Sequence, residues 1–149
     1  MEILAPFEPP HMDTVTGLAI VGDKLISGSK DKNLRLWDLD HSVGNLKNTA
    51  HAFNEYITTV QSQNPENLSP NEPYLPLFYA GSKDGQIKVG TVKGEKIDFI
   101  GSILAHTQSV NAISILEDSS TLVTASADKT IKLWKPTAET VENINKEFC

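Results

Sequence analysis

The stretch SGSKDKNLRLW at residues 27–37 recurs twice, as AGSKDGQIKVG at 80–90 and as TASADKTIKLW at 124–134. The three copies begin 53 and 44 residues apart. Each copy joins a turn rich in Ser, Lys and Asp to a run in which apolar residues alternate with polar ones, which is typical of β-strands. The chain is therefore built from an internal repeat, and the repeat decides the fold.

A histidine and a further short strand pattern precede each copy. His11 comes before residues 15–20, His51 before 57–60 and His106 before 110–115. Each unit thus reads as strand a after the histidine, strand b running into the Ser-x-Asp turn, and strand c ending at the tryptophan position. Strand d follows in units one and two, at roughly 44–47 and 96–103. These short runs between turn clusters predict an all-β fold of antiparallel meanders.

This pattern of His, Ser-x-Asp and Trp resembles the WD40 repeat over about residues 2–136. The resemblance implies a β-propeller fragment with one four-stranded antiparallel blade for each unit. The layout expected from it is a lead-in at 1–10 that supplies strand d of a preceding blade, blade 1 at 11–47, blade 2 at 48–103 with a Pro-rich insertion at 63–76, blade 3 at 104–136, and a tail or short helix at 137–149.

The resemblance also implies a hydrogen-bonded tetrad in each blade. The Trp indole can only donate, a hydroxyl can accept and pass on a hydrogen bond, and an imidazole can link hydroxyl to carboxylate. The serine two residues before the Asp occurs in all three units and is preferred, with Ser27 as a substitute for Ser29. We expect structural, not catalytic, roles for these residues: His11, Ser29, Asp31, Trp37, His51, Ser82, Asp84, His106, Ser126, Asp128 and Trp134.

Unit two departs from the family pattern because Gly90 stands at the tryptophan position. If the other members of its tetrad are intact, Gly90→Trp should be tolerated or stabilising. Three blades are also too few for a closed propeller. We expect the final blades of a larger ring, with Glu2 to Phe7 as a strand d, and an isolated chain that self-associates through its exposed blade edges.

The first unit and its lead-in further resemble the C-terminal WD-repeat tail of kinesin-4 class motors, and the likeness continues in order through the later units. It implies a surface that contacts cargo or microtubule-associated partners, in a cytoplasmic and cytoskeletal setting. Gly90 and the insertion before Leu77 depart from that family. The residues that carry the likeness are 9–11, 13, 15, 18–19, 22–23, 27–29, 31, 37–40, 50–51, 87–89 and 124–134.

Composition excludes several other functions. A net charge of −6 argues against general binding of nucleic acid or anionic membranes. Cys149 is the only cysteine, and no His or carboxylate cluster has metal-ligand spacing, so we expect no metal and no cofactor. The sequence contains no phosphate-binding Gly-x-x-x-x-Gly-Lys motif, and Asp40, His41 and Ser42 are adjacent, which does not make a catalytic triad. We expect no enzyme activity from these residues.

Two functions remain open: an interaction platform in a kinesin-like tail, or a stand-alone, self-assembling WD-repeat scaffold. Basic residues share one position in strand c of each unit, at Arg35, Lys88 and Lys132, and a structural role there is preferred to a basic stripe for tubulin. The candidate partner contacts lie in the turns beside the tetrad Asp and in the loops entering strand a. They are Lys30, Tyr56, Lys83 and Gln108.

Overall fold

The computed structural model describes residues 6–40, 43–63, 76–116 and 121–135, and its regular structure in these ranges is all β-strand. The predicted C-terminal helix, most of the insertion and residues 2–5 of the lead-in lie outside them. Blade 1 contains β1 (Val15–Val21), β2 (Lys24–Ser29), β3 (Asn33–Asp40) and β4 (Val43–His51); blade 2 contains β5 (Ile57–Ser62), β6 (Leu77–Ser82), β7 (Gln86–Lys93) and β8 (Lys96–Leu104); blade 3 contains β9 (Val110–Ile115), β10 (Leu122–Ser126) and β11 (Ile131–Trp134).

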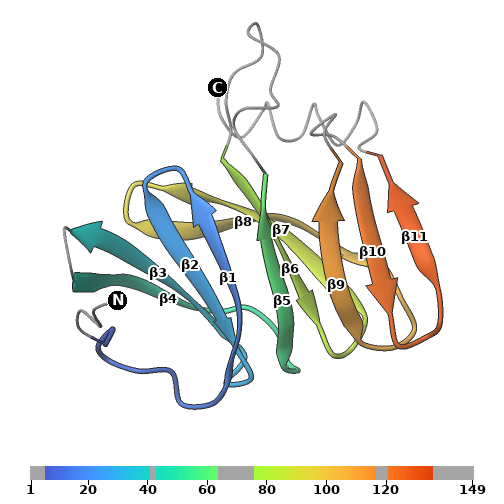
Figure 1. The fold of residues 1–149 in the computed structure, drawn as a ribbon, viewed down its shortest axis with the longest axis horizontal. Coiled ribbons are helices and arrows are strands. Elements are labelled where there is room, and N and C mark those ends of the chain that lie inside the picture. The colour runs from blue at the N-terminus through green and yellow to red at the C-terminus, as the bar shows by residue number, and fades with distance from the viewer. Residues whose placement is uncertain (1–5, 41–42, 64–75, 117–120, 136–149) are drawn as a thin grey trace, which may run out of the picture.

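The three blades are antiparallel meanders, which confirms the predicted fold class. The strand orders are β1-β2-β3-β4, β5-β6-β7-β8 and β11-β10-β9. In Figure 1 the sheets stand side by side, with β5 between β1 and β9. Within the described residues blade 3 shows three strands, in agreement with a sequence that indicates strand d only in units one and two.

The turn between the second and third strands of each blade adopts the same backbone shape. Lys32, Gly85 and Lys129 occupy equivalent positions and have φ angles of 71°, 88° and 72°. A side chain is sterically disfavoured in this left-handed region, although Lys tolerates it here. At Gly85 a Cβ atom would lie 2.0 Å from the His106 carbonyl oxygen, so glycine is required there. The Ser-x-Asp motif therefore ends in a fixed turn.

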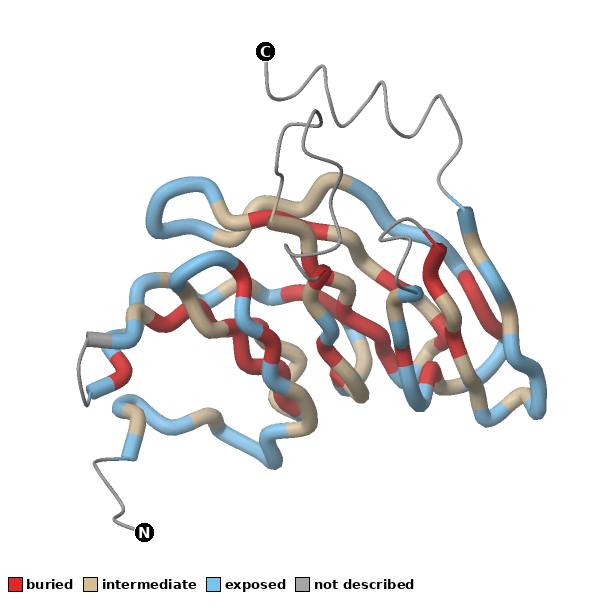
Figure 2. Tube along the Cα trace, turned by 45° about the horizontal axis from the view of Figure 1, so that its top comes forward, coloured by how far each residue is buried: buried red, intermediate tan, exposed pale blue. Residues whose placement is uncertain are grey.

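The hydrophobic core lies between the blades. Ile26, Leu34 and Leu36 of blade 1 pack against Ile57 and Val60 of blade 2, and all five are buried. A second cluster joins Ile87 of blade 2 to blade 3. Figure 2 shows buried segments concentrated in the sheet interiors, with exposed segments at the turns. Because burial of these side chains supplies most of the stabilisation, each blade depends on its neighbours.

Adjacent blades are also tied by hydrogen bonds between their first strands. The Thr16 hydroxyl donates to the Ile57 carbonyl oxygen at 2.7 Å. The Thr58 hydroxyl, at the same position of blade 2, donates to the Val110 carbonyl oxygen of blade 3. The contact between blades is therefore a repeated one, in its polar as well as its apolar part.

Candidate functional site

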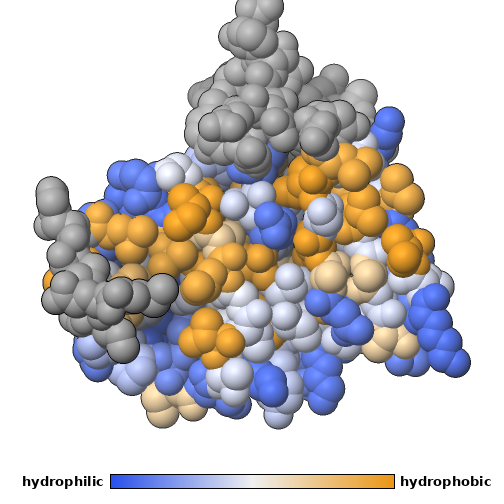
Figure 3. All heavy atoms as spheres, viewed as in Figure 1, coloured by the Kyte–Doolittle hydropathy of each residue, from blue (hydrophilic) through white to orange (hydrophobic). Residues whose placement is uncertain are grey.

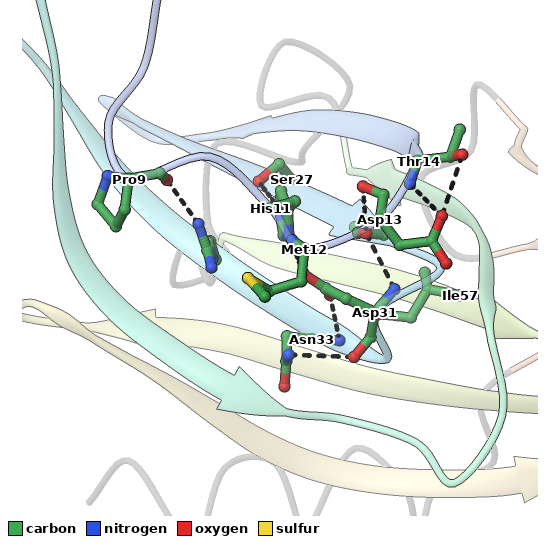
Figure 4. A network of polar contacts seen from close by, with 12 residues as sticks. Pro9, His11, Met12, Asp13, Thr14, Ser27, Asp31, Asn33 and Ile57 are labelled. Atoms are coloured by element: carbon green, nitrogen blue, oxygen red, sulfur yellow. Dashed lines mark hydrogen bonds and ion pairs between the residues drawn. The ribbon is translucent and has the colours of Figure 1, made fainter.

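A continuous polar network crosses blade 1 (Figure 4). The Trp37 indole Nε1 donates to Ser27 Oγ at 2.8 Å, and Ser27 Oγ lies 2.7 Å from His11 Nε2. His11 Nδ1 lies 2.8 Å from Asp31 Oδ2. Because an ionised carboxylate only accepts, Nδ1 carries the proton and Nε2 accepts from the serine hydroxyl. Both ring nitrogens are thus engaged, and the imidazole has no free nitrogen with which to act on a substrate.

Asp31 anchors this network to two loops. Its carboxylate also accepts the backbone N–H groups of Met12 and Asn33, each at 3.0 Å. Burial alone would raise the pKa of Asp31, but these N–H groups and His11 outweigh burial and hold its pKa below the ordinary value. The charged form of Asp31 is therefore the one that the fold requires.

Blade 3 repeats the network with a threonine. Trp134 Nε1 donates to Thr124 Oγ1 at 2.9 Å, and His106 lies 2.8 Å from that oxygen and 2.9 Å from Asp128 Oδ2. The Thr130 hydroxyl is the main cause that holds the pKa of Asp128 far below its ordinary value, and His106 adds to it against the opposing effect of burial. Blades 1 and 3 therefore share one device, although their hydroxyl residues differ.

The preference for Ser29 and Ser126 as the tetrad hydroxyls was wrong. Strand register pairs Trp37 with Leu25, so Ser27 is the diagonal neighbour that an indole can reach, and Ser29 lies two residues further along the strand. Ser29 instead accepts the Asp31 N–H at 3.0 Å and donates to the Asp13 carbonyl oxygen at 3.1 Å. It joins the turn to the loop before β1, and Ser126 does the same in blade 3 with Asp128 and Gln108.

Blade 2 has no such network among its described residues, and the assignment of His51 to it was wrong. His51 is the exposed last residue of β4, where its Nδ1 lies 3.3 Å from Asn33 Oδ1. Phe53 holds the histidine position, because it precedes Ile57 by four residues, as His11 precedes Val15. The spacing of four residues to the first strand can be read from the sequence, and it identifies Phe53 as the residue at the histidine position.

Equivalent backbone bonds support this alignment of the blades. The Ala52 N–H donates to the Lys32 carbonyl oxygen at 3.1 Å, and the Ala105 N–H donates to the Gly85 carbonyl oxygen at 3.0 Å. Each alanine directly precedes the residue at the histidine position, so Phe53 corresponds to His106. Blade 2 therefore lost its histidine as well as its tryptophan.

The remaining tetrad positions of blade 2 are also changed. Ala80 stands where Ser27 and Thr124 supply hydroxyls. Ser82 corresponds to Ser29, but its buried hydroxyl has no hydrogen-bond partner in the part of the chain that the structure describes, so its assignment to a tetrad was wrong too. Among the described residues Asp84 keeps the turn contact, accepting the Gln86 N–H at 3.1 Å.

An aromatic cluster, formed by Phe53, Phe78 and Phe99, fills the interior of blade 2. Phe78 is fully buried opposite Gly90, and its ring meets that of Phe99 edge-on at 6.4 Å. Lys88 Nζ lies 5.2 Å from the Phe53 ring centre and 5.0 Å from that of Phe99. The large aromatic ring is therefore on the second strand of blade 2, at Phe78, whereas in blades 1 and 3 it is the tryptophan of the third strand. An apolar cluster takes the place of the polar network.

The three basic residues of the third strands point into their own blades. Arg35 Nη1 donates to the Pro9 carbonyl oxygen at 2.6 Å, and Lys132 Nζ donates to the Ala105 carbonyl oxygen at 2.7 Å. Lys88 makes its cation–π contacts inside blade 2 instead. These contacts support the structural interpretation of this position over a basic stripe for an acidic partner.

The turns after β2 and β6 and the loops before β5 and β9, which carry the candidate contact residues, lie at one end of the strands, the lower end in Figure 1. Lys30, Tyr56, Lys83 and Gln108 are all exposed there. The Lys83 N–H donates to the Tyr56 carbonyl oxygen at 2.9 Å, and Lys83 Nζ lies 5.0 Å from the Tyr56 ring centre. The Lys30 N–H makes the same backbone bond to Thr14 at 2.9 Å. We call these four residues, with the exposed Met12, the turn surface.

The described residues contain no group of three or more His, Cys, Asp or Glu side chains that could hold a metal ion. Within the same ranges, no helix has the length and apolar character needed to cross a membrane. The polar networks of blades 1 and 3 are engaged internally, whereas the turn surface faces outward. This geometry suits contact with another macromolecule.

Comparison with known proteins agrees with the geometry. The family described as WD domain, G-beta repeat matches residues 6–38 and 98–135, which hold the two complete networks. WD40 repeats are thus found in these two segments. The second segment begins within β8, so the matches leave out the first three strands of blade 2, β5 to β7. WD40 repeats indicate a protein-interaction scaffold.

Several known proteins are similar over most of this chain. The human kinesin-like protein KIF21A is 30% identical over 129 residues, 87% of this chain and 7% of its own length. The mouse kinesin-like protein KIF21B is 34% identical over 128 residues, 86% of this chain and 7% of its own. A ribosome biogenesis protein WDR12 homologue from Drosophila virilis is 30% identical over 121 residues, 80% and 26% of the two chains. The chain therefore spans only a small part of these relatives.

Proposed function

We propose that this chain is the interaction module of a kinesin-like motor and contacts microtubules or cargo-linked proteins through the turn surface. The observation that carries the proposal is the fixed pair of Tyr56 and Lys83, an exposed aromatic ring beneath a lysine ammonium group. Tyrosine is enriched among the residues that dominate protein–protein contacts, and a lysine ammonium group beside it favours an acidic partner. The similarity to two kinesin-like proteins supports the choice of partner.

The module acts without catalysis in this proposal, since ATP hydrolysis would belong to a motor domain. A cytoplasmic, cytoskeletal location follows from the same similarity. Sequencing the transcript upstream of Met1 tests the motor assignment: an in-frame phosphate-binding loop and coiled coil support it, and an upstream reading frame without them argues against it.

Microtubule binding provides the direct test of the surface. We expect the purified protein to sediment with polymerised microtubules, and Lys83→Glu to raise the dissociation constant about tenfold, as loss of an interface anchor does. Lys135→Glu is the matched control, because it makes the same charge change just after β11, at the other end of the strands. Equal weakening by both variants, or no sedimentation of the unaltered protein, would count against this surface.

A further inference from the structure

One apolar position of the first strand is covered in two blades and uncovered in the third. Leu18, Val60 and Ile113 are equivalent, since they pair with Ser27, Ala80 and Thr124. Val60 and Ile113 are 4% and 6% exposed, because blades 1 and 2 cover them, whereas Leu18 of blade 1 is 60% exposed. Val15 and Ile20 lie exposed beside it on β1. We call Val15, Leu18 and Ile20 the front face.

On the other side of the row of three blades, a position of the third strand is covered in blades 1 and 2 and exposed in blade 3. Leu34, Ile87 and Ile131 share one position of the third strand; the first two are fully buried, and Ile131 is 71% exposed. Leu133, two residues on, is exposed as well, although the equivalent Leu36 is buried. We call Ile131 and Leu133 the rear face. Hydrophobic surface gathers over blades 1 and 3 at the two sides of Figure 3.

The hydrogen bonds that join neighbouring blades leave one donor position, in blade 3, without a following blade. Thr16 and Thr58 donate to the first residue of the next blade's first strand, Ile57 and Val110. Asn111 holds this donor position in blade 3 and is exposed. Its side-chain amide can donate the same bond to a following blade. The acceptor would be the carbonyl oxygen of the first residue of that blade's first strand, the position that Val15 holds in blade 1.

We propose that a second copy of this chain supplies that blade, so that the rear face of each copy packs on the front face of the other. Equivalent surfaces already fit each other within the chain, because a rear position packs on a front position twice, between blades 1 and 2 and between blades 2 and 3. Two such contacts are related by symmetry and close two three-blade arcs into a six-bladed ring. The second contact forms within the dimer, which raises its effective concentration. This proposal does not depend on the motor assignment.

Light scattering and sedimentation of the full protein test this proposal. At tens of micromolar we expect one species of twice the 16.3 kDa chain mass. Leu18→Lys and Leu133→Glu should each give monomers with unchanged circular dichroism, because both side chains are exposed in the single chain. Leu104→Glu is the control: Leu104 is 73% exposed on β8, outside both faces, and its variant should remain a dimer. Asn111→Ala should weaken dimerisation about thirtyfold, because one hydrogen bond is lost at each of the two contacts.

Mixing the two monomeric variants distinguishes the proposed arrangement from other dimers. An equimolar mixture of Leu18→Lys and Leu133→Glu should form heterodimers, because one of the two contacts then joins unaltered faces. A monomeric unaltered protein, open-ended oligomers, a dimer unaffected by Leu133→Glu, or no heterodimer in the mixture would each overturn the proposal.

Discussion

Gly90→Trp is expected to lower the free energy of unfolding by about 3 kcal/mol, the upper part of the range for overpacked cores. A Cβ atom at Gly90 would lie 2.4 Å from Phe78 Cζ and 2.9 Å from the Asp98 carbonyl oxygen. The backbone atom cannot move aside cheaply, and Phe78 already fills the space that an indole takes in blades 1 and 3. This expectation reverses the one drawn from the repeat pattern alone.

Urea unfolding of a double-mutant cycle checks this result. Phe78→Ala alone should cost about 3–5 kcal/mol, as removal of a buried ring does, and the double variant should be more stable than the sum of the single effects predicts. Gly101→Trp is the matched control, because nothing lies within 4 Å of a Cβ there and Gly101 is exposed. A stable Gly90→Trp protein, or strictly additive effects, would show that Phe78 does not occupy the tryptophan space.

The second large effect is expected at the tetrad carboxylate. Asp31→Ala should destabilise the protein by about 2–3 kcal/mol at pH 7, because a buried histidine ring and two backbone N–H groups lose a charged acceptor. Asp98→Ala is the control. Asp98 pairs with Lys93 at 2.7 Å in an exposed salt bridge, which contributes less than about 1 kcal/mol. Asp128→Ala should resemble Asp31→Ala, and equal melting temperatures for the Asp31 and Asp98 variants would remove the tetrad assignment.

The cost of Asp31→Ala should depend on pH in a definite direction. The pKa of Asp31 is lowered in the folded protein, so its carboxylate stabilises the fold at all pH values above its unfolded pKa of about 3.9. This contribution is lost as the pH falls below that value and through the folded pKa. Thermal melting between pH 7 and pH 2 should therefore show the two proteins converging in acid. A constant difference over that range would contradict the cause given for the shift.

The repeat fold was predictable from the sequence because its signals are local. Alternating apolar residues and the Ser-x-Asp turn placed the strands closely, and the same turn geometry recurs at Lys32, Gly85 and Lys129. The hydroxyl partner of Trp37 was not predictable from counting along one strand. It depends on the register between two strands, which pairs Trp37 with Leu25 and brings Ser27 within reach.

Blade 2 was misread for a related reason. The His51 assignment followed residue type, whereas the distance to the first residue of strand a identifies Phe53. The aromatic cluster joins Phe53, Phe78 and Phe99 from three different segments, so no local pattern announces it. From the sequence, Gly90 suggested a tetrad that lacked only its tryptophan. The histidine and hydroxyl positions of blade 2 are changed too, so the whole polar network is replaced by an apolar cluster.

The indole N–H spectrum of the protein labelled with 15N-tryptophan tests the polar networks of blades 1 and 3 most directly. Trp37 and Trp134 are the only tryptophans, so two resonances are expected. Ser27→Ala should shift the Trp37 resonance alone, Thr124→Val should shift that of Trp134 alone, and Ala80→Ser in blade 2 should shift neither. Indole resonances that ignore Ser27 and Thr124 and respond instead to Ser29→Ala and Ser126→Ala would contradict the networks on which this description of the blades rests.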